Sequence, residues 1–310
     1  MSGERLPYER LSVVIPAFNE AEAIGKTLEQ ILAATPGAEI LVVDDFSRDR
    51  TCEIATAFAG VRVIRHSFNR GQGASLKTGM RAATRPYVAW FDADNEHKTG
   101  DLERLFKRML DDRLVAVIAQ RTNGSTSTVR ALGKWMIRLI GRGMQIKAGS
   151  DLNCGLRIFR RPVILRYLAL IPDRFSSSLV TTLVMLERRY PLAFVPITTS
   201  PRIGVSTVRL KDGFEAILQL LRAILLFAPM RIFLPVGLWT IGAGLLYSAV
   251  VALFAGRGVP VGGMLLVLAG LMTMILGLLA DQISQMRLGQ FDGDIGAVLD
   301  DLDDEGPLPR

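Results

Sequence analysis

Two aspartates separated by one residue are the sharpest chemical feature of this 310-residue sequence. Asp92 and Asp94 close the apolar run 87–91, and carboxylates at positions i and i+2 of an extended chain point to the same side. They repel each other unless a cation lies between them or one is protonated. Oxygen ligands favour Mg²⁺ or Mn²⁺, which usually keep positions open for phosphate oxygens. We therefore predict a divalent-metal site, with Glu96 as a third ligand or a residue that holds a water; a solvated loop is the alternative.

Polar side chains also follow two other apolar runs. Asn19 and Glu20 come after the apolar run 11–15, and Asp44 and Asp45 come after the apolar run 39–43. An aspartate in such a place can accept a hydrogen bond from a base imide or a ribose hydroxyl. These residues are candidates for binding a nucleotide.

Two glycines stand before a helical pattern in the segment Gly71-Gln72-Gly73. They leave room for a ligand close to the backbone, although a hinge or turn would explain them as well. The dinucleotide fingerprint is absent because Leu76 occupies its third glycine position.

Alternating strand and helix patterns over the first 120 residues must position these groups. We predict an α/β fold, with a mostly parallel sheet and helices on both faces. Ligands of such sheets bind beyond the carboxyl ends of the strands, which is where the polar residues stand. The expected strands are 11–15, 39–43, 61–65, 87–91 and 114–119, and the expected helices are 20–34, 49–59, 73–83 and 101–110.

Two long uncharged runs follow in the C-terminal third. Residues 232–256 and 258–280 contain no charged side chain, and Arg257 separates them. A helix of about 23 residues is about 35 Å long and can cross a hydrocarbon core of about 30 Å. We predict two transmembrane helices within 232–280, preceded by an interfacial amphipathic helix over 212–231. Two buried core helices are a poorer explanation, because no element remains to bury them.

Charge is divided unevenly along the chain. The net charge is +7, but the acidic tail 281–310 carries −6, which leaves +13 on the rest. A basic body beside a membrane hairpin favours anionic lipid headgroups or phosphorylated ligands, and no nucleic-acid-binding motif accompanies the charge. Residues 128–145 predict a basic amphipathic helix that lies on a membrane or, equally, exposes a solvated face. Within the acidic tail, we expect residues 292–305 to be disordered.

Few residues are available for thiol or imidazole chemistry. The two cysteines, Cys52 and Cys154, and the two histidines, His66 and His97, have no metal or redox spacing. A disulfide framework and a zinc site are therefore not expected, and a reducing compartment fits. Because the N-terminus is polar and five bases in 202–231 precede the hairpin, we expect the large domain and both termini in the cytoplasm.

Several segments in fixed order resemble a known family. The segments 13–20, 41–49, 69–73 and 91–94 look like those of family 2 glycosyltransferases, which have the GT-A fold, a Rossmann-like α/β arrangement. Segments 151–160 and 201–206 resemble the polyprenyl-phosphate branch, which includes dolichol-phosphate mannose synthase and bacterial relatives with two C-terminal membrane helices. The resemblance covers about residues 11–280 and implies a GT-A domain over 11–211, after a flexible N-terminus of residues 1–10.

The resemblance implies a role for each matching residue. Arg121 and Arg157 would lie near the acceptor phosphate, and Arg202 would face the donor diphosphate from a mobile loop. Asp151 would lie near the acceptor, as a base or in a structural salt bridge with Arg157. The implied catalytic residues are Asp94, Asp151, Arg121 and Arg202; the implied nucleotide-sugar residues are Pro16, Asn19, Glu20, Asp44, Asp45, Asp92 and Arg202; the implied ligands of Mg²⁺ or Mn²⁺ are Asp92, Asp94 and Glu96.

The sequence departs from the family pattern in five places that concern substrate identity rather than class. One is the segment 176–178, which lacks the acid often found before the following helix. Phe46 replaces the glycine of the usual Asp-Asp-Gly-Ser, and Gln72 replaces a glycine-flanked lysine. Glu96 stands where glutamine is usual, and Thr207 stands where the loop usually has lysine.

The reaction that the resemblance implies is inverting transfer of a sugar from a GDP- or UDP-sugar to a polyprenyl or dolichyl phosphate at the cytoplasmic membrane face. The lipid phosphate is already anionic near neutral pH, so no strong base is required. The alternatives are another acceptor, such as a polysaccharide or glycolipid, and a non-catalytic membrane scaffold that binds nucleotide-sugars. The Gln-x-x-Arg-Trp motif of processive synthases is absent. A homo-oligomer contact through the hairpin is a further alternative; its candidate glycines are Gly242, Gly244, Gly262, Gly263 and Gly270.

Overall fold

The computed structural model describes residues 6–122, 154–174, 177–198, 225, 229–255 and 258–290. They form two compact units, an α/β domain and a C-terminal helical hairpin. Asp151 and Arg202 lie outside the described residues. So do the predicted basic helix 128–145, nearly all of the predicted interfacial helix, and the tail from residue 291 onward.

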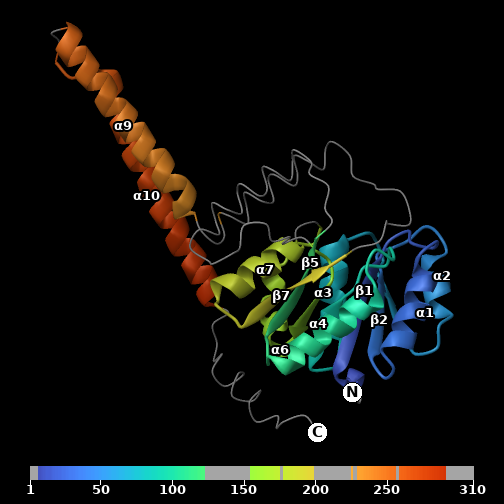
Figure 1. The fold of residues 1–310 in the computed structure, drawn as a ribbon. Coiled ribbons are helices and arrows are strands. Elements are labelled where there is room, and N and C mark those ends of the chain that lie inside the picture. Colours follow the sequence, from blue (N-terminus) through green and yellow to red (C-terminus); the bar gives the residue numbers. More distant parts are fainter. Residues whose placement is uncertain are drawn as a thin grey trace. The chain divides into compact units, whose positions relative to one another are not determined.

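A seven-stranded sheet forms the centre of the α/β domain (Figure 1). In the order β3-β2-β1-β4-β6-β5-β7, all neighbours are parallel except β6, which runs antiparallel to β4 and β5. The predicted mostly parallel sheet is confirmed with its five strands, and β6 and β7 are additional. The strands are β1 (Leu11–Ala17), β2 (Glu39–Asp44), β3 (Val61–Arg65), β4 (Tyr87–Trp90), β5 (Ala116–Arg121), β6 (Arg157–Arg160) and β7 (Leu192–Ile197).

Helices connect the strands, and the predicted bounds differ mainly at the ends. The first helix begins at Ile24 rather than residue 20, because residues 21–23 form a turn after Asn19, which has a left-handed backbone (φ 56°). The helices are α1 (Ile24–Ala34), α2 (Thr51–Thr56), α3 (Gln72–Ala82), α4 (Thr99–Asp111), α6 (Arg161–Arg166) and α7 (Ser177–Glu187), with short 3₁₀ turns η1 (Tyr8–Arg10) and η2 (Leu168–Leu170).

Both faces of the sheet are covered, as predicted. Successive strand residues point to opposite faces, and Val13 and Ile15 of β1 pack in one buried cluster with residues of α1 and α4 such as Leu28 and Phe106. Val14 points the other way, against α3: a Cβ on Gly79 would fall 2.2 Å from Val14 Cγ1. Burial of each large aliphatic side chain contributes about 1.5–3 kcal/mol, so this core fixes the strands whose ends carry the polar residues.

The C-terminal hairpin consists of two helices, α9 (Met230–Ala255) and α10 (Val261–Gly289), which lie side by side (Figure 1). By length and composition both can cross a membrane, and their outer side chains, such as Trp239 and Phe254, are exposed. Glycines let the helices approach: a Cβ on Gly270 would fall 2.7 Å from the carbonyl oxygen of Gly237.

Three of the five glycines considered for an oligomer contact lie where α9 and α10 of the same chain pack together. An added Cβ on Gly244, Gly263 or Gly270 would lie within 3 Å of an atom of the other helix. An added Cβ on Gly242 meets nothing within 4 Å, and one on Gly262 reaches only the ring of Tyr247, at 3.4 Å. Close packing within one chain therefore accounts for most of this glycine pattern.

Candidate active site

The carboxyl ends of neighbouring parallel strands bring the predicted polar residues to one edge of the sheet. β3, β2, β1 and β4 are consecutive and parallel, and Asp44 at the end of β2 stands in register with Ala17 at the end of β1. The amide of Phe91 donates to the carbonyl of Val14 (3.0 Å), so the segment after β4 also follows β1. This edge is the one where ligands of such sheets bind.

Asp92 is held by groups that are distant in sequence. Its Oδ1 accepts a hydrogen bond from Gln72 Nε2 (3.2 Å), and its Oδ2 contacts His97 Nε2 (3.2 Å). Gly155 lies against the same carboxylate, because a Cβ there would fall 2.0 Å from Asp92 Oδ2. The carboxylate therefore has a defined orientation at the end of β4.

The contact between Asp92 and His97 shifts both pKa values. Burial raises the pKa of Asp92, but the hydrogen bond and charge of His97, with two nearby arginines, outweigh burial and lower it. Burial lowers the pKa of His97, but the hydrogen bond and charge of Asp92, with the neighbouring carboxylates, outweigh burial and raise it. The His97 ring is 2% exposed and packs edge-on against Phe91. The pair favours an ionised Asp92.

Asp94 and Glu96 have different surroundings. Asp94 is buried, and its Oδ1 accepts a hydrogen bond from the amide of Glu96 (3.1 Å). The Glu96 carboxylate contacts Arg121 at the end of β5, with Oε1 3.1 Å from the guanidinium. The predicted third metal ligand and the predicted acceptor-phosphate residue therefore form an ion pair. Within the described ranges, no group of three His, Cys, Asp or Glu side chains is arranged to hold a metal ion.

Asp44 is fully buried and faces β3. Its Oδ2 lies 3.1 Å from Arg65 Nε, and its Oδ1 accepts a hydrogen bond from the amide of Ser47 (3.3 Å). Asp44 thus fixes both the turn after β2 and the arginine that ends β3.

Asp45 anchors the loop between β3 and α3. Oδ1 contacts His66 Nδ1 (2.7 Å) and accepts from the amide of Arg70 (2.9 Å), while Oδ2 accepts from the amide of Gly71 (2.7 Å). Both carboxylate oxygens are engaged within the protein, so in this structure Asp45 shapes the edge of the sheet rather than presenting a free acceptor.

The loop after β1 is tied to the loop after β2. The amide of Asn19 donates to Ser47 Oγ (3.0 Å), and the amide of Glu20 donates to Thr51 Oγ1 (2.8 Å). Pro16 pairs with Val43 within the sheet. Asn19 and Glu20, which follow β1, therefore lie beside the loop after β2, and Pro16 of β1 lies beside the last residues of β2.

The space beside Gly71 and Gly73 is filled by protein. A Cβ on Gly73 would fall 2.0 Å from the carbonyl oxygen of Pro172, and one on Gly71 2.7 Å from that of Asp173. The amides of Gly73 and Ala74 donate to the carbonyls of Arg174 and Asp173. The glycines thus allow segment 172–174 to pack on α3, and the ligand room considered from the sequence is taken up by this segment.

Arg157 lies in the interior. Its side chain is 0% exposed and stacks over the Trp90 ring at 5.3 Å. Its guanidinium donates to the carbonyl oxygen of Cys154 and to the carbonyl of Ser178 (2.7 Å) and Thr181 Oγ1 (2.9 Å). It therefore anchors the segment that presses Gly155 onto Asp92.

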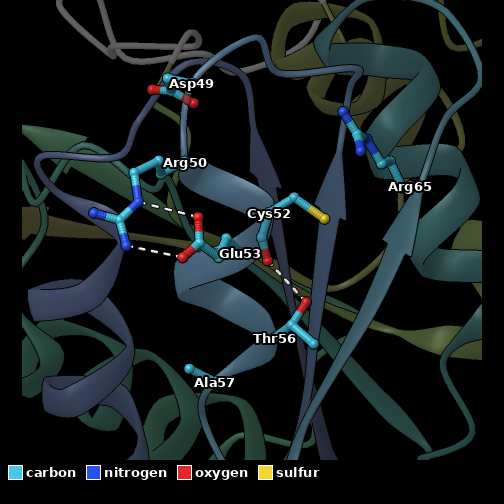
Figure 2. A pocket seen from close by; sticks show the side chains of 7 residues that line it. All are labelled: Asp49, Arg50, Cys52, Glu53, Thr56, Ala57 and Arg65. Carbon is cyan, nitrogen blue, oxygen red and sulfur yellow. Dashed lines mark hydrogen bonds and ion pairs between the residues drawn. The ribbon is translucent and has the colours of Figure 1, made fainter.

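A surface hollow of about 560 Å³ lies over α2 and the end of β3 (Figure 2). Arg50 and Glu53 form an ion pair on its wall, and Arg65 stands across from Cys52. None of the predicted site residues lines this hollow. Its lining residues are Asp49, Arg50, Cys52, Glu53, Thr56, Ala57 and Arg65.

Sequence reasoning missed the residues that orient the acids. Both histidines of the chain contact a predicted aspartate, His66 with Asp45 and His97 with Asp92. His97 stands only five residues after Asp92, which is a local signal that could have been used. Gly155 gave no signal, because its contact with Asp92 depends on the pairing of β6 with β4.

Two protein-family models match the chain. Residues 12–167, about half of the chain, match glycosyl transferase family 2. Residues 228–286 match the GtrB C-terminal hairpin and cover α9 and most of α10.

Curated relatives agree with these matches. An uncharacterized protein of Methanocaldococcus jannaschii is 33% identical over 200 residues, which is 62% of this chain and 82% of that protein. A dodecaprenyl-phosphate galacturonate synthase of Rhizobium johnstonii is 28% identical, over 68% of this chain and 65% of that protein. An undecaprenyl-phosphate 4-deoxy-4-formamido-L-arabinose transferase of Salmonella paratyphi A is 30% identical over 51% of each chain. The chain thus spans half to two thirds of the two named enzymes.

A solved structure shows the same fold. Glucosyl-3-phosphoglycerate synthase of Mycobacterium tuberculosis, in complex with Mn²⁺, UDP and glucosyl-3-phosphoglycerate, superimposes with a TM-score of 0.56 at 20% identity. The match covers 69% of this chain and 78% of that one.

Proposed function

The chain belongs to glycosyl transferase family 2, and on this basis we propose that it moves a sugar from a nucleotide-sugar to a polyprenyl phosphate in a membrane. One observation carries the proposal: a family 2 domain with carboxylates at the ligand-binding edge of its sheet is followed in the same chain by a hairpin that matches the GtrB C-terminal hairpin. The two named relatives have prenyl phosphates in their names, which supports this acceptor class.

The carboxylates after β4 are suitable ligands for a divalent metal ion. Asp92 and Asp94 are carboxylates at the end of β4, and the lowered pKa of Asp92 favours its charged form. Mg²⁺ in nucleotide sites is usually held by one or two carboxylates together with substrate phosphates, so a third carboxylate is not required. When bound, Mg²⁺ or Mn²⁺ neutralises charge on the departing diphosphate. Glu96 stays outside this set while it pairs with Arg121.

Residues after β1 and β2 bind the nucleotide in this proposal. Asn19, Glu20 and Pro16 form one wall, and the turn after Asp44 forms the other. Asp45 acts through the loop that it anchors.

The lipid phosphate oxygen attacks the anomeric carbon of the sugar, a carbon–oxygen bond forms with inversion, and the bond to the diphosphate breaks. Arg121 orients the acceptor phosphate through charge-assisted hydrogen bonds. Asp151 near the acceptor and Arg202 on the diphosphate keep the roles that the resemblance implies. Arg157 has no exposed surface for a phosphate, so we assign it to positioning Gly155 and Asp92.

The hairpin holds the domain at the bilayer that contains the acceptor. We propose two membrane crossings, with the catalytic domain and both termini in the cytoplasm. This orientation rests on the excess of bases before the first crossing.

Sugar transfer by the purified full-length protein tests the proposal. Nucleotide-sugars are screened against undecaprenyl and dolichyl phosphate in detergent with Mn²⁺ or Mg²⁺. We expect Asp94→Ala to lose at least about a hundredfold in rate, as removal of one charge-stabilising group does elsewhere. Asp111→Ala is the matched control, because Asp111 is an exposed aspartate at the end of α4. Full activity of Asp94→Ala would refute the metal role, and transfer only to a non-prenyl acceptor would refute the acceptor class.

A further inference from the structure

Phe46 has an unusual backbone conformation. It stands two residues beyond the end of β2 with φ 66°, in the left-handed region that bulky side chains avoid. Asn19 and Asn95, at the same edge, have similar angles, but asparagine tolerates them. Glycine would make this turn without steric strain. The backbone conformation at this position therefore favours glycine, yet the chain has phenylalanine there.

The residues on both sides of Phe46 hold it in this conformation. Asp45 is bound through both carboxylate oxygens to the loop before α3. Ser47 donates its amide to Asp44 and accepts at Oγ from the amide of Asn19. Strained residues persist where their surroundings over-determine them, and they cluster at functional sites.

The ring itself lies beside a fixed arginine. The centre of the Arg65 guanidinium is 5.9 Å from the Phe46 ring centroid. Arg65 is held by Asp44 Oδ2 (3.1 Å) and by the carbonyl oxygen of Ser47 (3.1 Å), and the Phe46 side chain remains 40% exposed. A planar aromatic ring and a planar cation are thus presented together to solvent.

We infer that Phe46 and Arg65 form the stacking platform for the nucleobase of the donor, an inference that rests on the proposed function. Nucleobases stack on aromatic side chains and on guanidinium planes. The platform is joined through Asp44 and Ser47 to the loop that carries Asn19, which is the wall assigned to the nucleotide. Because every base has a stacking face, the platform accepts uracil and guanine alike.

A nucleobase fits this geometry better than a membrane surface does. Phe18 and Phe68 are also exposed, beyond β1 and β3, and exposed rings with basic neighbours can enter a lipid interface. Such an interface does not need a guanidinium held beside the ring, whereas a stacked nucleobase gains from both planar groups. A contact of Phe46 with lipid would instead appear in the test as a higher KM for the lipid acceptor alone.

Nucleotide binding by the full-length protein in detergent tests the inference. Affinities for UDP, GDP and pyrophosphate are measured with Mn²⁺ by calorimetry, together with the melting temperature. We expect Phe46→Gly to bind both nucleotides at least about tenfold more weakly, the usual effect of losing one stacked ring. Pyrophosphate, which has no base, should bind as it does to the wild type. The melting temperature should stay equal or rise, because glycine relieves the left-handed strain.

Three further variants sharpen the test. Phe46→Trp should keep nucleotide affinity within about threefold, because it restores an aromatic face. Arg65→Gln should weaken nucleotide binding, whereas Arg50→Gln, an arginine of the same hollow that pairs only with Glu53 among the contacts seen (Figure 2), should not. Unchanged nucleotide affinity of Phe46→Gly overturns the inference, as does an equal loss for pyrophosphate or a higher KM for the lipid acceptor alone. A wild type that binds no nucleotide overturns the proposed function as well.

Discussion

The space around Asp92 is filled so closely that one methyl group should disturb it. In Gly155→Ala, the added Cβ would fall 2.0 Å from Asp92 Oδ2, so the carboxylate must move. Misplacement of a reacting group by about 1 Å can reduce rates by up to about a hundredfold. We therefore expect Gly155→Ala to lower kcat/KM for sugar transfer at least about tenfold, measured with saturating metal.

Gly100→Ala in the first turn of α4 is the matched control, because a Cβ there meets nothing within 4 Å. It should leave activity unchanged and stabilise the protein by about 0.5–1 kcal/mol, the usual gain when alanine replaces a helical glycine. Wild-type activity of Gly155→Ala would show that Asp92 tolerates displacement and that its orientation is unimportant.

The pair of Asp92 and His97 predicts how stability depends on pH. The pKa of His97 is raised in the folded protein, so its contribution is complete below its unfolded pKa of about 6.5 and is lost as pH rises through the folded value. The pKa of Asp92 is lowered, so its contribution is complete above about pH 4 and is lost as pH falls through the folded value. The pair therefore stabilises most between about pH 4 and 6.5.

His97→Gln tests this window, because glutamine does not titrate. The difference in melting temperature between wild type and variant should be larger near pH 5.5 than near pH 9, on either side of the ordinary histidine range of about 6.5. A difference that stays constant with pH would mean that packing against Phe91, rather than charge, is what His97 supplies.

At the scale of single residues, the sequence predicted the acidic side chains at the edge of the sheet but not the side chains that contact them. Asp92 and Asp94 were found because a strand pattern ends at them. Glu96 was predicted as a metal ligand, yet its carboxylate contacts Arg121 on another strand. Such pairings depend on which strands become neighbours, and residue spacing carries no information on that.

At the scale of elements, periodicity predicted the first five strands and their helices. β6 escaped because its four residues, Arg157–Arg160, begin and end with arginine and show no apolar run. It forms a strand because it pairs with β4 on one side and with β5 on the other. Both of its arginines are buried by tertiary contacts. β7 differs, because its residues form an apolar run that the sequence prediction did not include; its place in the sheet comes from parallel pairing with β5. The inserted antiparallel strand brings Gly155 to Asp92.

The hairpin predicts an asymmetry between two of its glycines. Gly270 faces α9, where a Cβ would fall 2.6 Å from Ile241 Cγ1, whereas a Cβ on Gly242 meets nothing within 4 Å. We expect Gly270→Leu to force the helices apart and to destabilise the hairpin by about 1–3 kcal/mol, the usual effect of overpacking. Gly242→Leu should have little effect on thermal unfolding in detergent. If Gly242→Leu instead dissociates an oligomer while Gly270→Leu does not, the glycines serve contacts between chains.

At the scale of the whole molecule, two units divide the work. In the proposed reaction, the α/β domain provides the polar edge for a water-soluble donor, and the hairpin, whose two helices are long and apolar enough to cross a membrane, provides the apolar surface for a lipid acceptor. This division was visible in the sequence as a break between a basic body and two uncharged runs. The side of the membrane that the domain faces is a separate prediction, which rests on the charge asymmetry around the hairpin.

The two cysteines make that orientation measurable without adding a label site. Cys52 is partly exposed on the wall of the hollow over α2 (Figure 2), whereas Cys154 is fully buried. A membrane-impermeant maleimide should therefore react at Cys52 alone in the folded protein. With a cytoplasmic domain, we expect labelling in inverted vesicles, and in sealed right-side-out vesicles only after permeabilisation. Cys52→Ser should abolish the signal, and denaturation should expose Cys154 as a control for reagent activity. Labelling of sealed right-side-out vesicles would place the domain on the opposite side and contradict the orientation inferred from the charge asymmetry.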